Sequence, residues 1–166
     1  IYLMKYYIFL FFLLFNFNLI ELKSQDKIPN LYVKTIDGKP IRTISTINSE
    51  GLTIYSFWAT WCIPCIVELN AIHEVYDQWK DETNVKLIAV ALDDNRTKRR
   101  VKPFVSGKGW KFEILLDENQ DFQRSLNIEN PPYTIVTDGI KILQKRNGYK
   151  PGEEKDLYEF ILKNSK

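Results

Sequence analysis

Hydrophobic residues along this chain form two kinds of pattern, continuous runs and stripes of helical period. The stretch 52–58 is almost entirely apolar or β-branched, and 85–92 is dominated by the same residue types. Such runs predict strands that are buried on both faces of a sheet. Between them, apolar residues recur every three or four positions from Cys65 to Trp79, which predicts a helix beginning near Pro64. The chain therefore alternates buried strand, helix and buried strand.

Shorter apolar segments, separated by turn residues, predict the remaining elements. Asp93-Asp94-Asn95 predicts the start of a helix that Gly107 and Gly109 end, and Asp138-Gly139 predicts a hairpin. We expect strands at 31–33, 112–116, 133–137 and 140–143, and helices at 97–106, 120–126 and 153–163. Strands that alternate with helices imply βαβ crossovers, and the closing hairpin adds antiparallel strands. The fold class is therefore α/β, with a mixed central sheet flanked by helices.

The N-terminal segment has a different character from the rest of the chain. Lys5 precedes an apolar run at 6–15 that continues, with two asparagines, to Ile20. A short positive region followed by about ten to fifteen apolar residues is typical of a secretory signal, and Ser24 offers a cleavage point. An uncleaved membrane anchor and a buried core helix are the alternatives. We expect residues 1–24 to be a signal peptide or N-terminal membrane anchor and 25–166 to form one domain outside the cytoplasm.

Composition and charge narrow the function classes. The chain has 166 residues, of which 45% are hydrophobic, and this suits one domain with a sizeable core. A net charge of +2 is too small to indicate a nucleic-acid surface. Five basic residues between Arg96 and Lys102 are interleaved with Val101, Phe104 and Val105, so we interpret them as the solvent-facing side of an amphipathic helix.

The two cysteines of the chain, Cys62 and Cys65, fall where a predicted strand turns into a predicted helix. Unpaired N–H groups and the dipole at a helix N-terminus favour a thiolate there. Cys62 is therefore the expected attacking thiol, and Cys65 can resolve the mixed disulfide, while Ile63 and Pro64 restrict the turn. A structural disulfide would close too small a loop to stabilise much. A zinc site would need four ligands, and besides the cysteines the chain has one histidine, His73, so we expect no metal.

Two prolines and a tryptophan are further candidates for the same site. Pro132 follows Pro131 directly and precedes a predicted strand. A proline in this place can be held cis and present backbone groups to an extended partner, although an ordinary rigid turn is the alternative. Trp61 is either a docking aromatic beside Cys62 or a core residue.

The segment from Trp58 to Cys65, together with Glu68 and Pro132-Tyr133-Thr134, resembles thioredoxin-like proteins of the TlpA/ResA type, which are exported thiol-disulfide oxidoreductases. The resemblance covers about 29–163. It implies a thioredoxin-like fold with an extra βα insertion, here 85–92 and the helix after it, between the CxxC helix and the cis-proline strand.

Residues that separate this family from ordinary thioredoxins bear on mechanism. Ser56 stands where thioredoxins keep a buried aspartate, and Glu68 matches a glutamate of the TlpA/ResA type. Glu68 shares a helix face with Cys65, so a core-facing carboxylate with a raised pKa could take the proton of that thiol. The alternative is a surface glutamate near the helix dipole. Pro131 replaces the usual Thr, Val or Ile and lacks an N–H for a docked strand, and Asn70 replaces a proline common in the family.

These observations predict an exported enzyme that reduces disulfides in other envelope or periplasmic proteins. The resemblance implies cysteine-containing exported clients, apocytochrome c among them by analogy, and a membrane-embedded thiol reductant. We expect a monomer that needs no cofactor besides the Cys62–Cys65 disulfide. The alternatives are a net disulfide donor and a non-catalytic binding module. The candidate catalytic residues are Cys62, Cys65 and Glu68, and the candidate substrate-binding residues are Trp61, Ile63, Pro64, Pro131 and Pro132.

Overall fold

The computed structural model describes residues 26–165, so the predicted signal peptide or anchor at 1–24 lies outside the described residues. Seven strands form one sheet in the order β2-β1-β5-β4-β3-β6-β7. The strands are β1 (Tyr32–Thr35), β2 (Pro40–Arg42), β3 (Leu52–Trp58), β4 (Lys86–Ala91), β5 (Glu113–Leu116), β6 (Tyr133–Asp138) and β7 (Lys141–Asn147). The helices are α2 (Ile63–Thr83), α3 (Val101–Lys108), α4 (Asp121–Ser125) and α5 (Glu153–Asn164), with short 3₁₀ turns η2 (Thr43–Thr46) and η3 (Lys98–Arg100).

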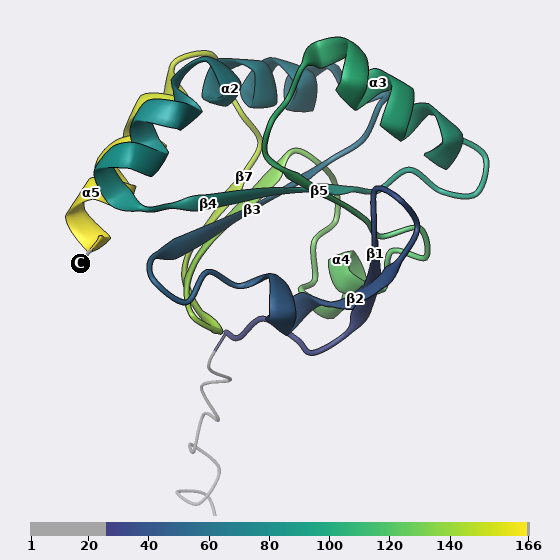
Figure 1. Cartoon of the computed structure of the whole chain (residues 1–166), viewed down its shortest axis with the longest axis horizontal. Helices are drawn as coiled ribbons and strands as arrows, with labels where there is room; N and C mark the ends of the chain where they lie inside the picture. The colour runs from purple at the N-terminus through teal and green to yellow at the C-terminus, as the bar shows by residue number, and fades with distance from the viewer. Residues whose placement is uncertain (1–25, 166) are drawn as a thin grey trace, which may run out of the picture.

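The sheet is mixed and is covered on both faces. Strands β3, β4 and β5 run parallel, whereas β6 pairs antiparallel with β3, and β7 pairs antiparallel with β6. Helices α2, α3 and α5 lie on one face of the sheet, and α4 lies on the other (Figure 1). This arrangement confirms the predicted thioredoxin-like fold with a mixed sheet flanked by helices. Within residues 26–165, no helix combines the length and the apolar character needed to cross a bilayer.

Strand β3 forms the centre of the core, and all seven of its residues are buried, as its apolar run predicts. Because side chains alternate along a strand, Ile54 and Trp58 pack beneath α2, and Tyr55 and Phe57 pack on the opposite face. There they contact the ring of Phe122 in α4, at centroid distances of 5.6 and 5.2 Å. The buried strand therefore fixes both layers of the fold, and its C-terminal end leads directly into the cysteine pair.

The helix predicted at about 97–106 is present as η3 and α3 together, and its ends differ from the prediction by one or two residues. The 3₁₀ turn η3 comes first, α3 begins at Val101, and Gly107 lies inside the helix, which ends at Gly109 with a φ of +68°. Asp93 does not cap this segment, because its carboxylate binds Thr60. Asp94 of the same cluster accepts the N–H of Arg96 at its carboxylate and those of Thr97 and Lys98 at its backbone oxygen. The five basic residues from Arg96 to Lys102 are exposed or half-buried, whereas Val101 and Val105 are buried, so the predicted solvent-facing side is confirmed, although only Lys102 lies in α3 itself.

The C-terminal part of the sheet differs from its prediction in length. Strand β7 continues to Asn147, four residues beyond the predicted end, with a register shift between Val136 and Thr137 of its partner strand. Residues 144–147 are polar, and they are tolerated in a strand because β7 is the edge of the sheet. The short strand β2 also has no counterpart in the prediction.

Candidate active site

The cysteine pair lies between the C-terminal end of β3 and the first turn of α2. Cys62 is the N-cap residue of the helix, and Cys65 lies one turn inside it. The two form a disulfide with their Cα atoms 5.3 Å apart. The backbone N–H of Cys65 donates to the sulfur of Cys62 at 3.3 Å. Cys62 keeps 5% of its surface exposed and Cys65 none, so the first cysteine is the one that a partner can reach.

Exposed apolar side chains surround the disulfide. Trp61 is 57% exposed and Ile63 is 75% exposed, and Pro64 is exposed as well. The alternative of Trp61 as a core residue is therefore wrong. Apolar surface of this kind next to a reactive sulfur gives a partner chain area to bury.

An aspartate that follows β4 accepts hydrogen bonds from the loop that carries Trp61. The backbone N–H of Thr60 donates to Asp93 Oδ2 at 2.8 Å, and the Thr60 hydroxyl donates to Asp93 Oδ1 at 2.6 Å. Asp93 is only 1% exposed. Both carboxylate oxygens are therefore paired, and hydrogen bonds to a charged acceptor are among the stronger ones in proteins. The pair fixes the loop before Cys62 to the loop after β4.

Glu68 belongs to α2 and its side chain is buried in the core, which contradicts the alternative of a surface glutamate. It is 5% exposed, and Thr134 of β6 donates to its Oε1 at 2.8 Å. Within the described residues its Oε2 has no hydrogen-bond partner. Burial raises the pKa of Glu68 to about 7, against lowering effects from the Thr134 hydrogen bond and from Arg146 and a raising effect from Glu153. The carboxyl group is therefore able to exchange a proton near neutral pH.

The peptide bond between Pro131 and Pro132 is cis, as one of the two readings of this pair predicts. Pro132 is buried, and its carbonyl accepts the N–H of Gly148 at 2.9 Å. The next residue, Tyr133, pairs in register with Phe57 near the end of β3. The cis-proline therefore lies at the end of the sheet from which the cysteine pair emerges.

Several residues that shape the site were not expected from the sequence. Thr60 and Asp93 fix the loop, Thr134 binds Glu68, and Asn70 accepts a hydrogen bond from Trp110 Nε1 at 3.1 Å. All three contacts join segments 33 to 66 residues apart. The only one of these contacts with a signal in the sequence is that of Asp93, which belongs to the Asp93-Asp94-Asn95 cluster, and this cluster predicts a helix start instead.

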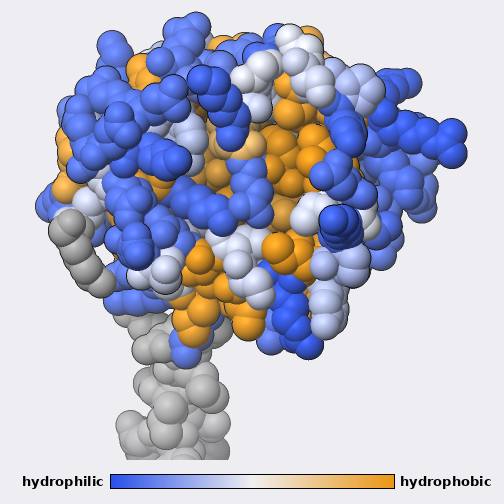
Figure 2. Space-filling model, in the orientation of Figure 1, coloured by the Kyte–Doolittle hydropathy of each residue, from blue (hydrophilic) through white to orange (hydrophobic). Residues whose placement is uncertain are grey.

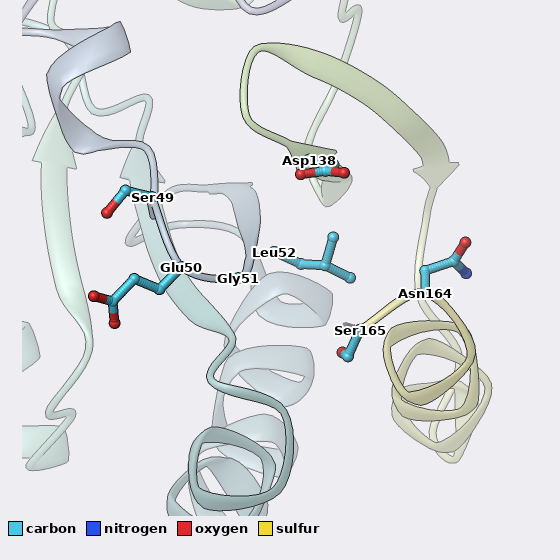
Figure 3. Close-up of a pocket in the computed structure, with 7 residues that line it drawn as sticks. All are labelled: Ser49, Glu50, Gly51, Leu52, Asp138, Asn164 and Ser165. Atoms are coloured by element: carbon cyan, nitrogen blue, oxygen red, sulfur yellow. The ribbon is translucent and has the colours of Figure 1, made fainter.

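Other parts of the described chain offer less for chemistry. Among residues 26–165 no group of three or more His, Cys, Asp or Glu side chains is placed to hold a metal ion. A hollow of about 80 Å³ lies near Leu52, at the opposite end of β3 from the cysteines. Figure 3 shows Leu52, Asp138, Asn164 and Ser165 around it, with Glu50 pointing away. It contains no thiol, imidazole or cationic group, so the cysteine pair remains the candidate active site.

Known proteins resemble the chain over most of its length. Residues 24–147 match the model of the AhpC/TSA family. The chain is 32% identical over 132 residues to the thiol-disulfide oxidoreductase ResA of Bacillus thuringiensis (strain Al Hakam). This alignment covers 78% of this chain and 73% of that relative. A thioredoxin-like protein from Porphyromonas gingivalis, solved in solution, is 40% identical, with a TM-score of 0.73 over 85% of this chain and 93% of that one. The crystal structure of StoA from Bacillus subtilis is 25% identical, with a TM-score of 0.64 over 81% and 98% of the two chains.

Proposed function

We propose, from the premise that this chain belongs to the AhpC/TSA family and is a thiol-disulfide oxidoreductase of the ResA type, that it reduces disulfides in proteins outside the cytoplasm. Cys62, Cys65 and Glu68 are the proposed catalytic residues. Trp61, Ile63, Pro64, Pro131 and Pro132 are the proposed client-binding residues. The non-catalytic binding module is set aside, because the relatives are named as oxidoreductases and the pair has CxxC spacing.

One observation carries the proposal. The attacking position holds Cys62 at the edge of solvent, and the resolving position holds the fully buried Cys65. One turn further along the same helix lies Glu68, a buried carboxyl with a raised pKa, of which one oxygen has no partner among residues 26–165. A general base is most effective when its pKa lies near the working pH. This order of accessible sulfur, buried sulfur and buried base suits a two-step disulfide exchange.

The reductive reaction begins with the Cys62 thiolate, which attacks one sulfur of a client disulfide. A bond forms between Cys62 and the client, the client S–S bond breaks, and the departing client thiolate takes a proton from water. Cys65 then gives its proton to the Glu68 carboxylate and attacks the Cys62 sulfur. The Cys62–Cys65 disulfide forms and the second client thiolate leaves. Two electrons have passed to the client, and a thiol reductant must return two electrons to the protein.

The resemblance supports the direction and the setting proposed for this reaction. Exported clients with cysteines would be the acceptors, and a membrane-embedded thiol reductant would be the donor. The signal-like segment before residue 25 supports a location in the periplasm or cell envelope. Apocytochrome c, whose haem-attachment thiols must be reduced, is one such client by analogy. The domain would act as a monomer and with its own disulfide as the sole redox group.

Trapping tests the proposal and names the client. In Cys65→Ala the second step cannot occur, so mixed disulfides should accumulate on Cys62 and release reduced client on treatment with dithiothreitol. Cys62→Ala/Cys65→Ala is the matched control and should trap nothing. Equal insulin-reducing activity in this double variant and the native protein would end the proposal.

The reduction potential of the pair, measured against glutathione and dithiothreitol, decides the direction. We expect a value near that of thioredoxin, about −270 mV. A value near about −120 mV, typical of a strong oxidant, would overturn the reductive direction and favour the disulfide donor.

A further inference from the structure

A hollow of about 460 Å³ opens beside the cysteine pair on the side of the loop after β4. Its apolar walls include the exposed ring of Trp61 and the buried Leu92, and its polar lining comes from Asp94, Arg96, Thr97 and Gln120. Trp61 directly precedes Cys62. A chain that brings a sulfur to Cys62 therefore has this hollow next to it, with room for one or two of its side chains.

The position of the hollow is fixed by the hydrogen bonds between the two loops. Asp93 accepts two hydrogen bonds from Thr60. The backbone oxygen of Asp94 accepts the N–H groups of Thr97 and Lys98 at 3.0 and 2.8 Å. The start of the basic run is thereby held beside Trp61, and Arg99 and Arg100 follow the lining residue Thr97 by two and three positions. Lys98, Arg99 and Arg100 form the 3₁₀ turn η3, which leads directly into α3.

Most charged residues of the loop that lines the hollow form ion pairs. Arg96 pairs with Asp94 at 2.9 Å, Lys98 pairs with Glu118 at 2.8 Å, and the last lysine of the run pairs with an aspartate of the β1–β2 turn. Arg99 and Arg100 are exposed, and neither forms an ion pair with any of residues 26–165. Figure 2 shows hydrophilic side chains projecting from the end of the molecule where the loop before α3 lies in Figure 1. Two neighbouring arginines therefore carry positive charge that no ion pair among the described residues offsets.

We propose that the Trp61 hollow and the Arg99–Arg100 pair form a docking surface for client segments in which acidic residues flank the reacting cysteine. The proposal rests on the function proposed above and adds the class of client. The apolar wall takes a client side chain next to the cysteine, and the arginines attract carboxylates a few residues away. Complementary charge of this kind raises the rate of association more than the final affinity.

Two matched pentapeptides test the preference. One carries glutamates and the other lysines around a central cysteine, and each is oxidised to its symmetrical disulfide. The rate of oxidation of the dithiol protein is followed by tryptophan fluorescence. At about 10 mM salt, where charges act over about 30 Å, we expect the acidic peptide to react about tenfold faster, and near 1 M salt this difference should vanish.

Charge reversal locates the effect. Arg99→Glu/Arg100→Glu should lose the preference for the acidic peptide or reverse it. Lys80→Glu/Lys163→Glu is the matched control, because it changes the net charge equally near the ends of α2 and α5. Lys80 lies 18 residues beyond Cys62, about 27 Å along the helix. This control should keep the preference, and thermal unfolding of both variants checks that they fold.

A neutral peptide with serine flanks separates this proposal from the proposed function. If the protein reduces it and shows equal rates for the acidic and basic peptides, only the docking surface is wrong. If no peptide is reduced, the proposed function itself fails. Binding of the native protein, and not of the Arg99/Arg100 variant, to phosphatidylserine vesicles with equal peptide rates would assign the arginines to a membrane surface and overturn the proposal.

Discussion

One carboxylate oxygen of the buried Glu68 has a hydrogen-bond partner and the other has none among residues 26–165. The two oxygens have opposite effects on the pKa of this group. Thr134 stabilises the ionised form by donating to Oε1, whereas the absence of a partner for Oε2 favours a bound proton. Burial has the larger effect, so the pKa of Glu68 rises from 4.5 to about 7. A buried group of this kind links proton binding to stability as well as to redox chemistry.

The sign of the stability change follows from the two pKa values. Between pH 4.5 and about 7 the folded protein keeps a proton that the unfolded chain has released. The free energy of unfolding of the oxidised domain should therefore fall as pH rises through this range, by up to about 3 kcal/mol. Glu68→Gln should remove that part of the slope in urea titrations across the range. Glu74→Gln, at an exposed site on the same helix, should keep it.

The substitution Thr134→Val tests the pKa of Glu68 in a second way. The substitution removes the donor to Oε1, so the pKa of Glu68 should rise further and its carbon NMR signal should titrate at a higher pH. An unchanged midpoint in Thr134→Val, or an unchanged stability slope in Glu68→Gln, would contradict the assignment of this pKa.

At the scale of elements, the site depends on a contact between two loops. Asp93, after β4, accepts both hydrogen bonds that Thr60, after β3, can donate. The parallel pairing of β3 with β4 brings the two loops to the same end of the sheet. The position of the disulfide is therefore set by the register of the central strands.

Asp93→Ala should destabilise the domain by about 2 kcal/mol, because it leaves the N–H and hydroxyl of the half-buried Thr60 without their acceptors. Hydrogen exchange at the Thr60 amide should accelerate, and urea denaturation measures the loss in stability. Asp93→Asn keeps one acceptor oxygen and should lose less. Slow exchange at Thr60 in the alanine variant would show that the loop is held by other contacts.

The elements that the sequence predicts best are those whose burial is decided locally. The seven buried residues of β3 and the apolar stripe of α2 need only a nearby core, and both are confirmed. The exact start of α3 could not be predicted, because Thr60, 33 residues away, takes the carboxylate of Asp93, and Asp94 opens the 3₁₀ turn η3 before the helix. Thr134 was missed for the same reason, since its role exists only when β6 lies beneath α2.

On the scale of the whole molecule, the disulfide contributes little to the fold. Two aromatic and aliphatic layers enclose the sheet, one under α2 and α5 and one against α4. The disulfide joins residues only three positions apart, whereas these layers join strands from the whole domain. The domain should therefore remain folded in both redox states, as an enzyme that cycles between them requires.

Reduction should lower the free energy of unfolding by no more than about 2 kcal/mol, the loop-entropy contribution of so short a closure. Circular dichroism in dithiothreitol, followed through a urea titration, measures this difference. Cys62→Ser/Cys65→Ser should match the reduced protein. Loss of secondary structure on reduction would mean that the bond is structural.

The recessed position of Cys62 between two projecting side chains limits what can meet it. Trp61 and Ile63 stand more than half exposed on either side of a residue that is 5% exposed. A flat, rigid surface would touch those two flanking groups before its own disulfide came within bonding range. A loose, extended polypeptide can thread past them, so the geometry selects partners that have not yet acquired their final shape. Extended segments, rather than compact folded surfaces, are therefore the partners that this geometry admits.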